Sequence, residues 1–206
     1  MHSMFGSPEY RKYFQDQRLD NNVTNISDQI FKYMDHLEGL IPDVIHKKVL
    51  DVGCRSFDTY DWYFKKNYES DIVGIDIGIE GLEYCFQQGK PCLYCDAHKL
   101  LETFPPVTFD LVLSFHSLEH MYDMPLVLCN MYKVLKPGGF LFLAVPIPSM
   151  NEGKGHWVDI PSGEHMCRVC MEAGFQKPIY EETVNCKFRI ANEYVALLQK
   201  PGNSND

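Results

Sequence analysis

Short β-rich runs alternate with stretches that can form helices along the middle of the chain, and this alternation restricts the folds that the chain can adopt. The runs are KVLDVG (48–53), DIVGIDI (71–77), PCLYC (91–95), FDLVLSF (109–115) and FLFLAVP (140–146). Each intervening stretch is long enough for a helical crossover, which is the pattern of right-handed βαβ units. The sequence therefore predicts an α/β fold with a largely parallel sheet.

Three of the helix-forming stretches have recognisable ends. In one, Pro125 suits an opening turn after Asp123, and apolar residues recur at helical spacing until the stop Pro137-Gly138-Gly139. In another, Gly174 is placed to end the helix. In the helix before the first strand, Ser27 is expected to be the N-cap. These helices are predicted from Asp123 to Lys136, from about Ser162 to Ala173, and from Ser27 through Leu37.

Two further β-like runs, 177–184 and 188–199, follow near the C-terminus. The connection between them is too short for a helical crossover, so they should form an antiparallel hairpin. We therefore expect the sheet to be mixed at its end.

The length and charge favour one globular domain that does not bind nucleic acid. A chain of 206 residues with 45% hydrophobic content can bury a core without disulfides or metal. The formal charge of −9 argues against a default affinity for phosphate backbones. The predicted organisation is an N-terminal helical segment at 1–44 that is either a lid or a surface helix, a main domain at 45–200 and a tail at 201–206.

The sequence shows no apolar region typical of a signal peptide and no apolar stretch as long as a membrane span. We therefore expect a cytoplasmic protein without membrane contact. In that compartment the eight cysteines are expected to be reduced and mostly buried rather than paired in disulfides.

Carboxylates follow three successive β runs, at the edge of the predicted sheet where ligands bind in open α/β folds. Asp51 and Gly53 end the first run, Asp76 ends the second, and Asp96 follows the third. An acidic residue about 20 positions after the first glycine is the usual partner of ribose hydroxyls, because a carboxylate accepts both hydrogen bonds. A lone aspartate at a strand end often only caps a turn, but three in this order favour a ligand site.

Five segments in this order resemble the motifs of class I S-adenosylmethionine-dependent methyltransferases, of the small methyltransferase type 11 kind, over about residues 45–200. The resemblance implies a Rossmann-like three-layer sandwich with a seven-stranded, mostly parallel sheet and an antiparallel last strand. The hairpin predicted independently above agrees with it. The segments are VLDVGC (49–54), IVGIDI (72–77), YCDAHKL (94–100), FDLVLSFHSLEHM (109–121) and VLKPGGFLFLAVP (134–146).

The resemblance also implies a role for particular residues in binding S-adenosylmethionine. Asp51 and Gly53 would belong to the first cofactor motif, with Gly53 allowing the backbone to approach the cofactor. The other residues implied in cofactor binding are Asp76 with Ile77 at the ribose, Asp96 at the adenine amino group, Ala97 at the adenine ring through its backbone, and Ser114 to His116 at the methionyl end and the methyl group.

The first motif departs from the family pattern, because Arg55 and Phe57 stand where further glycines are expected. A non-glycine residue at positive φ costs roughly 1–2 kcal/mol, which weakens binding without abolishing it. The ring of Phe57 could either occupy the cofactor space or turn into the core. Arg55 is expected to pair with the methionyl carboxylate of the cofactor, the alternative being a side chain directed to solvent.

Methyl transfer from a sulfonium needs alignment and, for weak nucleophiles, a base. His116 and His120 are the predicted catalytic residues, because imidazole titrates near neutrality and both lie beside the expected methyl position. Glu119 and His156 are weaker candidates, and each histidine could instead be structural.

Two patterns invite a zinc interpretation. Residues 116–120 match H-x-x-E-H, but they begin at the end of a β run rather than within a long helix. Two C-x-x-C pairs, Cys92/Cys95 and Cys167/Cys170, are better explained as buried thiols, since an offset of three in a strand sends two side chains to opposite faces. The sequence therefore predicts no metal site.

The acceptor is expected to be a small molecule, because no basic and aromatic tract of the nucleic-acid-binding type is present. Tyr10, Arg11 and Tyr13 could reach inward from an N-terminal lid, or belong to a surface helix. Two alternatives stay open: a protein that binds the cofactor without transferring the methyl group, and a methyltransferase acting on RNA or protein. The acceptor atom and the oligomeric state are not predicted.

Overall fold

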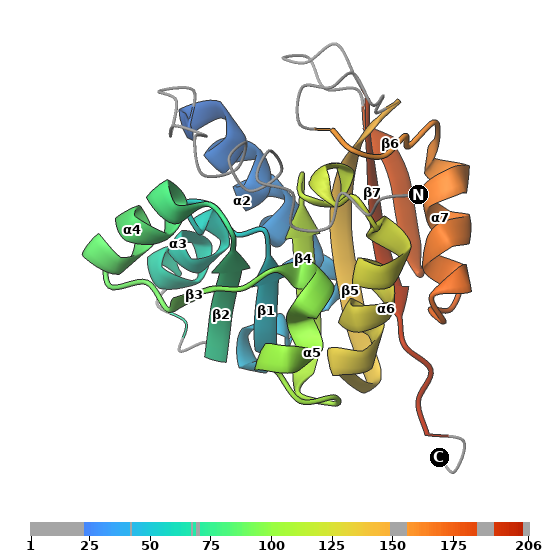
Figure 1. Ribbon diagram of the computed structural model, residues 1–206, viewed down its shortest axis with the longest axis horizontal. Helices are drawn as coiled ribbons and strands as arrows, with labels where there is room; N and C mark the ends of the chain where they lie inside the picture. The colour runs from blue at the N-terminus through green and yellow to red at the C-terminus, as the bar shows by residue number, and fades with distance from the viewer. Residues whose placement is uncertain are drawn as a thin grey trace, which may run out of the picture. The chain divides into compact units, whose positions relative to one another are not determined.

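Seven strands form one mixed sheet in the computed structural model, which describes residues 23–41, 43–66, 68, 71–148, 156–184 and 192–203 (Figure 1). The strands are β1 (Lys48–Val52), β2 (Asp71–Asp76), β3 (Cys92–Tyr94), β4 (Phe109–Phe115), β5 (Leu135–Ile147), β6 (Tyr180–Val184) and β7 (Asn192–Gln199). The α-helices are α2 (Val23–Leu40), α3 (Asp58–Lys65), α4 (Ile79–Gln87), α5 (Leu100–Thr103), α6 (Met124–Val134) and α7 (Gly163–Glu172). Short 3₁₀ turns are η1 (Val44–His46), η2 (Ala97–Lys99) and η3 (Leu118–His120).

The strand order in the sheet is β3-β2-β1-β4-β5-β7-β6. Strands β1, β2 and β3 pair in parallel, as do β4 and β5. Strand β7 is antiparallel to both β5 and β6. The predicted α/β fold, with a mostly parallel sheet and an antiparallel hairpin at the C-terminal end, is confirmed.

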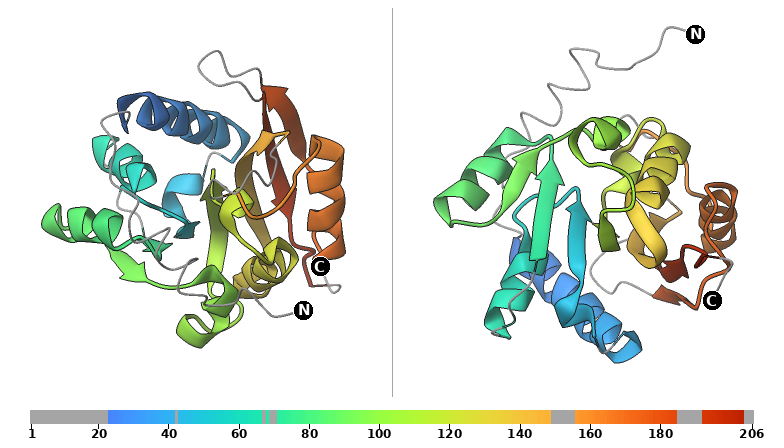
Figure 2. Two further views of the ribbon diagram at one scale, coloured as in Figure 1. Left: turned by 45° about the horizontal axis from the view of Figure 1, so that its top comes forward. Right: turned by 90° about the horizontal axis from the view of Figure 1, so that it is seen from below.

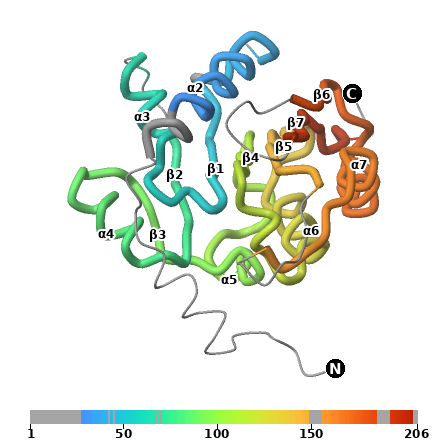
Figure 3. Tube along the Cα trace, turned by 90° about the horizontal axis from the view of Figure 1, so that it is seen from above, coloured from blue at the N-terminus to red at the C-terminus, as the bar shows by residue number. Residues whose placement is uncertain are grey.

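The chain divides into two compact units, one ending at Asp96 and the other beginning at Ala97. In the first unit α2 and α3 lie side by side (Figure 3). The indole Nε1 of Trp62 donates to Asp35 at 2.9 Å, and the Lys66 ammonium lies 2.9 Å from the same carboxylate. These contacts attach α2 to the helix that follows the first strand.

The second unit contains β4 to β7 with α5, α6 and α7, and α7 lies beside the antiparallel strands (Figure 2). The first residue of α7, Gly163, has no side chain at a point where a Cβ would be 2.3 Å from the ring of Tyr194 in β7. Gly163 therefore permits the close approach of this helix to the sheet.

The core consists mainly of the strands, as expected for parallel strands covered on both faces. In β4 every residue but Asp110 and in β5 every residue from Leu141 to Ile147 is buried. None of the helices in the described segments is long and apolar enough to cross a membrane.

The predicted ends of α6 and α7 are mostly confirmed. The Asp123 carboxylate accepts from Leu126 N at 3.1 Å with Pro125 in the first turn, and Ser162 Oγ accepts from His165 N at 3.2 Å. Gly174 has a left-handed φ of 111°, as a helix-ending glycine does.

The predicted extension of α6 to Lys136 is wrong. The helix ends at Val134, and β5 already begins at Leu135. The sheet register shifts between Phe109 and Leu111, so the extra residues of β5 are accommodated in an irregularity. Lys136 Nζ donates to both oxygens of Asp110, at 2.9 and 3.0 Å, and this cross-strand pair draws Lys136 into the sheet.

The prediction that Ser27 caps α2 is also wrong, because the helix begins at Val23 and Ser27 lies inside it. The position of the helix is set by its apolar side, on which Met34 and Leu37 are fully buried. A serine is only a weak signal for a helix start unless a breaking residue precedes it.

Replacing Gly74 of β2 by alanine should destabilise the first unit. Its Cβ would lie 2.7 Å from Cys54 Sγ and 3.1 Å from Phe57 Cε1, in a buried region, and such overpacking costs about 1–3 kcal/mol. Urea denaturation of Gly74→Ala should show a loss of that size. The control is Gly39→Ala in α2, where no atom lies within 4 Å of the new Cβ. Equal stabilities of the two variants would contradict the packing described here.

Candidate functional site

The loop after β1 has left-handed backbone at three positions, of which only one is occupied by glycine. Gly53, Arg55 and Phe57 all have left-handed backbone, with φ of 77°, 45° and 58°. Each of the two non-glycine residues carries a cost of roughly 1–2 kcal/mol in this region. Other contacts must therefore stabilise the loop.

Hydrogen bonds from β2 hold one side of this loop. The carbonyl oxygen of Ile75 accepts from Gly53 N at 2.9 Å and from Cys54 N at 3.0 Å. The Asp76 carboxylate accepts from Arg55 N at 2.8 Å through Oδ2 and from Gly78 N at 2.7 Å through Oδ1. Asp76 thus connects the loop after β1 with the loop after its own strand.

Contacts from α4 and the segment after it hold the other side. The ammonium of Lys90, a buried residue, donates to Ser56 O and to Asp61 Oδ2, both at 2.7 Å. The Cys85 thiol donates to Arg55 O at 3.3 Å. A Cβ at Gly81 would lie 2.9 Å from Arg55 O, so only glycine allows α4 to approach this closely.

The ring of Phe57 lies in the core. From the sequence it could have occupied either the core or the cofactor space. Its side chain is fully buried, and its ring lies 5.5 Å from that of Tyr60 between centroids. The space next to Gly74 accommodates it.

Asp51 lies beneath the loop rather than at its surface. It is 4% exposed, and its Oδ2 accepts from the hydroxyl of Thr59 in α3. Burial raises the pKa of Asp51 to about 7, with smaller contributions from the charges of Asp76 and Asp58, while the Thr59 hydrogen bond opposes the rise. The contact with Thr59 attaches the start of α3 to the end of β1.

Asp76 is half-buried and keeps hydrogen-bonding capacity. Burial raises its pKa, and the backbone N–H groups of Gly78, Arg55 and Ile77 oppose the rise. An ionised carboxylate has about four acceptor positions, and the backbone N–H groups of Arg55, Gly78 and Ile77 do not occupy all of them.

The three strand ends that carry the predicted cofactor carboxylates are neighbours in the first unit. Val52 pairs with Ile75 across β1 and β2, and Asp76 pairs with Tyr94 across β2 and β3. Cys95 N donates to Asp76 O at 3.0 Å, directly before Asp96. The structure therefore brings the strand ends of Asp51, Asp76 and Asp96 together.

A side chain of α6 holds the backbone of Ala97, the first residue of the second unit. The Asn130 side-chain amide donates to Ala97 O at 3.2 Å and to His98 O at 3.0 Å. The His98 ring stacks on Tyr122 with centroids 3.7 Å apart. Sequence reasoning missed Asn130, which carried no motif of its own.

Ser114 and His116 lie at the end of β4. Ser114 is fully buried, with its hydroxyl 2.7 Å from that of Ser117. His116 has a left-handed φ of 51°, and its Nε2 lies 3.3 Å from Glu193 Oε1 in β7. Glu193 was missed, although a carboxylate next to the apolar run YVALL is an unusual feature that could have indicated it.

The structure brings His120 and His156 together beside Glu119. The two imidazole centroids are 4.9 Å apart, and His120 Nε2 lies 3.9 Å from Glu119 Oε1. The backbone N–H of Trp157 donates to Glu119 O at 2.9 Å, which attaches the segment of His156 to the motif.

The C-x-x-C residues are mostly buried thiols, as predicted. Cys92, Cys95 and Cys170 are buried and Cys167 is half-buried. Burial raises the pKa of the Cys92 and Cys170 thiols, which keeps them protonated.

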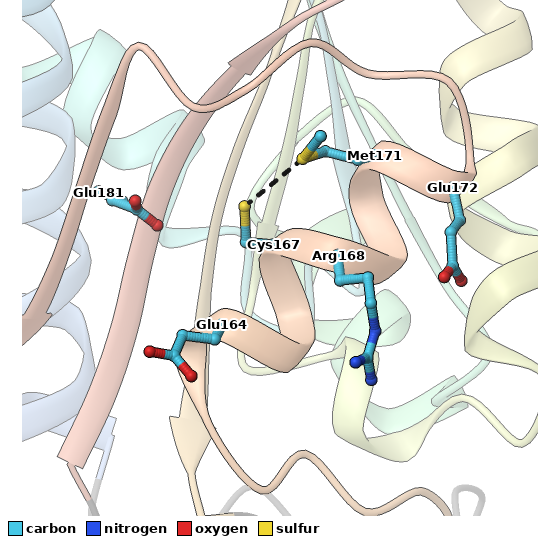
Figure 4. Close-up of a pocket in the computed structure, with 6 residues that line it drawn as sticks. All are labelled: Glu164, Cys167, Arg168, Met171, Glu172 and Glu181. Atoms are coloured by element: carbon cyan, nitrogen blue, oxygen red, sulfur yellow. Dashed lines mark hydrogen bonds between the residues drawn. The ribbon is translucent and has the colours of Figure 1, made fainter.

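One pocket of about 510 Å³ lies between α7 and β6 in the second unit. Cys167 faces it, and its Sγ lies 4.0 Å from Met171 Sδ (Figure 4). The residues that line it are Glu164, Cys167, Arg168, Met171, Glu172 and Glu181. None of them belongs to the cofactor or catalytic residues predicted from the sequence. The predicted lid residues Tyr10, Arg11 and Tyr13 lie outside the described residues.

Part of the chain is similar to known methyltransferases. Residues 50–143 match the family model described as "Methyltransferase domain". A phosphoethanolamine N-methyltransferase of Triticum aestivum is 26% identical over 166 residues, covering 75% of this chain and 33% of that protein. A ubiquinone biosynthesis O-methyltransferase of Idiomarina loihiensis is 28% identical over 137 residues, covering 64% of this chain and 52% of that protein.

Among solved structures, phosphoethanolamine N-methyltransferase 2 of Haemonchus contortus, in complex with S-adenosyl-L-methionine, superimposes with a TM-score of 0.72 at 15% identity. The match covers 95% of this chain and 61% of that one. The fold is thus that of the Rossmann-like methyltransferases. The match to a methyltransferase domain and this fold together support a class I S-adenosylmethionine-dependent methyltransferase. It spans about a third of the length of the first curated relatives.

Replacing Asp51 by asparagine should change how stability depends on pH. The folded-state pKa of Asp51 is about 7, above the usual 3.8, so the folded protein binds this proton more tightly than the unfolded chain. The resulting stabilisation is complete below about pH 4 and is lost as the pH rises to about 7.

Relative to wild type, Asp51→Asn should therefore gain stability between pH 4 and pH 7, by up to roughly 4 kcal/mol, and level off above. Urea denaturation of both proteins over this pH range measures the difference. A difference that does not vary with pH would show that Asp51 ionises normally.

Proposed function

We propose that this chain binds S-adenosylmethionine at the ends of β1, β2 and β3 and transfers its methyl group to a small-molecule acceptor. The observation that carries the proposal is the Asp76 carboxylate, which organises two loops and retains acceptor positions at the strand end where ligands bind in such sheets. The match of residues 50–143 to a methyltransferase domain supports the cofactor class.

Residues of the first unit, together with Ala97, which follows them in the sequence, fit an adenosyl group. Asp76 would accept the ribose hydroxyls, with Ile77 beside it, and the left-handed backbone at Gly53 would allow close approach of the cofactor. Asp96 would accept from the adenine amino group, and Ala97 would contact the ring through its backbone. Asp51, bound to Thr59, would act by positioning the loop.

The second unit supplies the groups proposed for the methyl-transfer side. The bound cofactor supplies an electrophilic methyl group on a sulfonium, so the chain needs only to align the acceptor and remove its proton. His116 is the proposed base, with Ser114 at the methionyl end and His120 as a further candidate. Glu193 Oε1 at 3.3 Å from Nε2 and Glu119 Oε1 at 3.9 Å from Nδ1 would orient the imidazole of His116.

The acceptor class rests on the relatives, whose names include phosphoethanolamine and ubiquinone-pathway enzymes. Small amines such as phosphoethanolamine and small phenols are therefore the first acceptors to assay. The alternative of a protein that binds cofactor without transfer loses part of its motivation, because Phe57 lies in the core.

Asp76→Asn should weaken cofactor binding at least about tenfold, because a hydrogen bond to a charged acceptor contributes about 1.5–3 kcal/mol. Calorimetric titration with S-adenosylmethionine and its demethylated product measures this. Asp71→Asn is the matched control, since Asp71 starts the same strand with its side chain 71% exposed. Equal affinity of the two variants, or no uptake by wild type, would contradict the proposal. Transfer of a labelled methyl group to small-molecule, RNA and protein pools then identifies the acceptor class.

The role of Arg55 is tested by two substitutions that separate backbone strain from charge. Arg55→Gly relieves the left-handed strain and should be more stable than Arg55→Ala by about 1 kcal/mol. If the guanidinium pairs with the methionyl carboxylate, both variants lose cofactor affinity by about tenfold. Unchanged affinity of Arg55→Ala would exclude this pairing.

A further inference from the structure

We propose that Glu119, His120 and His156 form a binding site for a divalent transition-metal ion of the Zn²⁺ class. One ligand atom from each residue, a carboxylate oxygen and two imidazole nitrogens, lies within 4.8 Å of the other two. Two imidazoles and one carboxylate are a donor set that suits Zn²⁺ and related ions, with at least one coordination position left open.

The spacing of one ligand pair is close to what a metal ion requires. Metal–ligand distances of 2.0–2.2 Å in a tetrahedral site place the ligand atoms about 3.4 Å apart. The 3.9 Å between His120 Nε2 and Glu119 Oε1 is too long for a hydrogen bond and slightly longer than this separation. Small side-chain movements would therefore close the site around an ion.

The backbone holds the three residues in place. Glu119 and His120 belong to the η3 turn, and the Trp157 N–H bond to Glu119 O at 2.9 Å fixes the residue after His156 against that turn. Segments far apart in the sequence are thus fixed together by a main-chain contact that does not depend on an ion. Glu119 is buried while both histidines are half-buried, so the site would be anchored inside and open toward solvent.

Two neighbouring groups lie close to the proposed ligands. His116 Nδ1 lies 3.9 Å from Glu119 Oε1, and its Nε2 lies 3.3 Å from Glu193 Oε1. Polar and charged groups near a ligating carboxylate orient it and tune its affinity. The H-x-x-E-H pattern had suggested zinc with both of its histidines as ligands, whereas the structure replaces the first of them by His156, which the sequence pattern does not connect to the motif.

A bound ion would act next to the proposed base, and this consequence rests on the proposed function. An open coordination position would take an oxygen of the acceptor and lower its pKa, so that the oxygen loses its proton to His116 more readily. The site therefore favours acceptors that present an oxygen ligand to the metal.

The test uses the full chain, freed of any affinity tag and stripped with a chelator. Titration with Co²⁺, followed by visible absorption, and with Zn²⁺, followed by calorimetry, should show one ion per chain. His156→Ala should weaken binding at least about tenfold. The control is His165→Ala, because His165 lies on α7 and contacts Arg168 instead. Absence of binding by wild type, or equal binding by His156→Ala, would overturn the proposal.

Two further measurements keep the result interpretable. Because Glu119 is buried, Glu119→Gln is judged only with its melting temperature: Zn²⁺ should raise the melting temperature of wild type and of His165→Ala but not that of Glu119→Gln or His156→Ala. The second measurement is titration of the metal-free protein with S-adenosylmethionine, which tests cofactor binding separately from metal binding. Cofactor uptake without metal uptake would overturn the metal site alone, and metal uptake without cofactor uptake would overturn the proposed function alone.

Discussion

The interaction on which the first unit depends is the pair of hydrogen bonds that the Asp76 carboxylate accepts from Arg55 N and Gly78 N. The loop after β1 has two non-glycine residues in left-handed backbone, at a combined cost of roughly 2–4 kcal/mol. Hydrogen bonds to a charged acceptor contribute about 1.5–3 kcal/mol each, which is enough to offset that strain. A carboxylate from the neighbouring strand thus takes over part of what additional glycines do in the family's first motif.

The rest of the loop follows from the same requirement. Lys90 contacts Ser56 O, and Gly81 lets α4 come within contact distance of Arg55 O. Burial of the Phe57 ring stabilises the left-handed backbone of this residue, because the ring fills the space beside Gly74. The loop after β1, which lacks glycine at positions 55 and 57, is therefore supported by glycines elsewhere, one in β2 and one in α4.

The sequence predicted the strands well because buried parallel strands read as continuous apolar runs, and Asp76 was recognisable because it follows such a run. It could not predict the direction of the Phe57 ring, which depends on a space beside Gly74 that only the β1–β2 register creates. The contact between Glu193 and His116 depends likewise on the pairing of β5 with β7. The β5 start at Leu135 was missed because Pro137 and two glycines look like a helix stop, and a bulged strand accepts them as well.

The end of β4, like the end of β1, has a left-handed non-glycine residue with carboxylates beside it. His116 is a non-glycine residue in left-handed backbone, its N–H donates to Ala144 O at 2.9 Å, and buried carboxylates of Glu119 and Glu193 face its ring. After β1 and after β4, left-handed residues lie at the carboxyl end of a strand with a carboxylate from another segment beside them, whereas Val107 has such backbone in the turn before β4. Strained residues persist only where their surroundings fix them, and such positions cluster where ligands bind. The strain at Arg55 and at His116 therefore indicates the same two strand ends as the carboxylates do, by an argument that does not depend on the family.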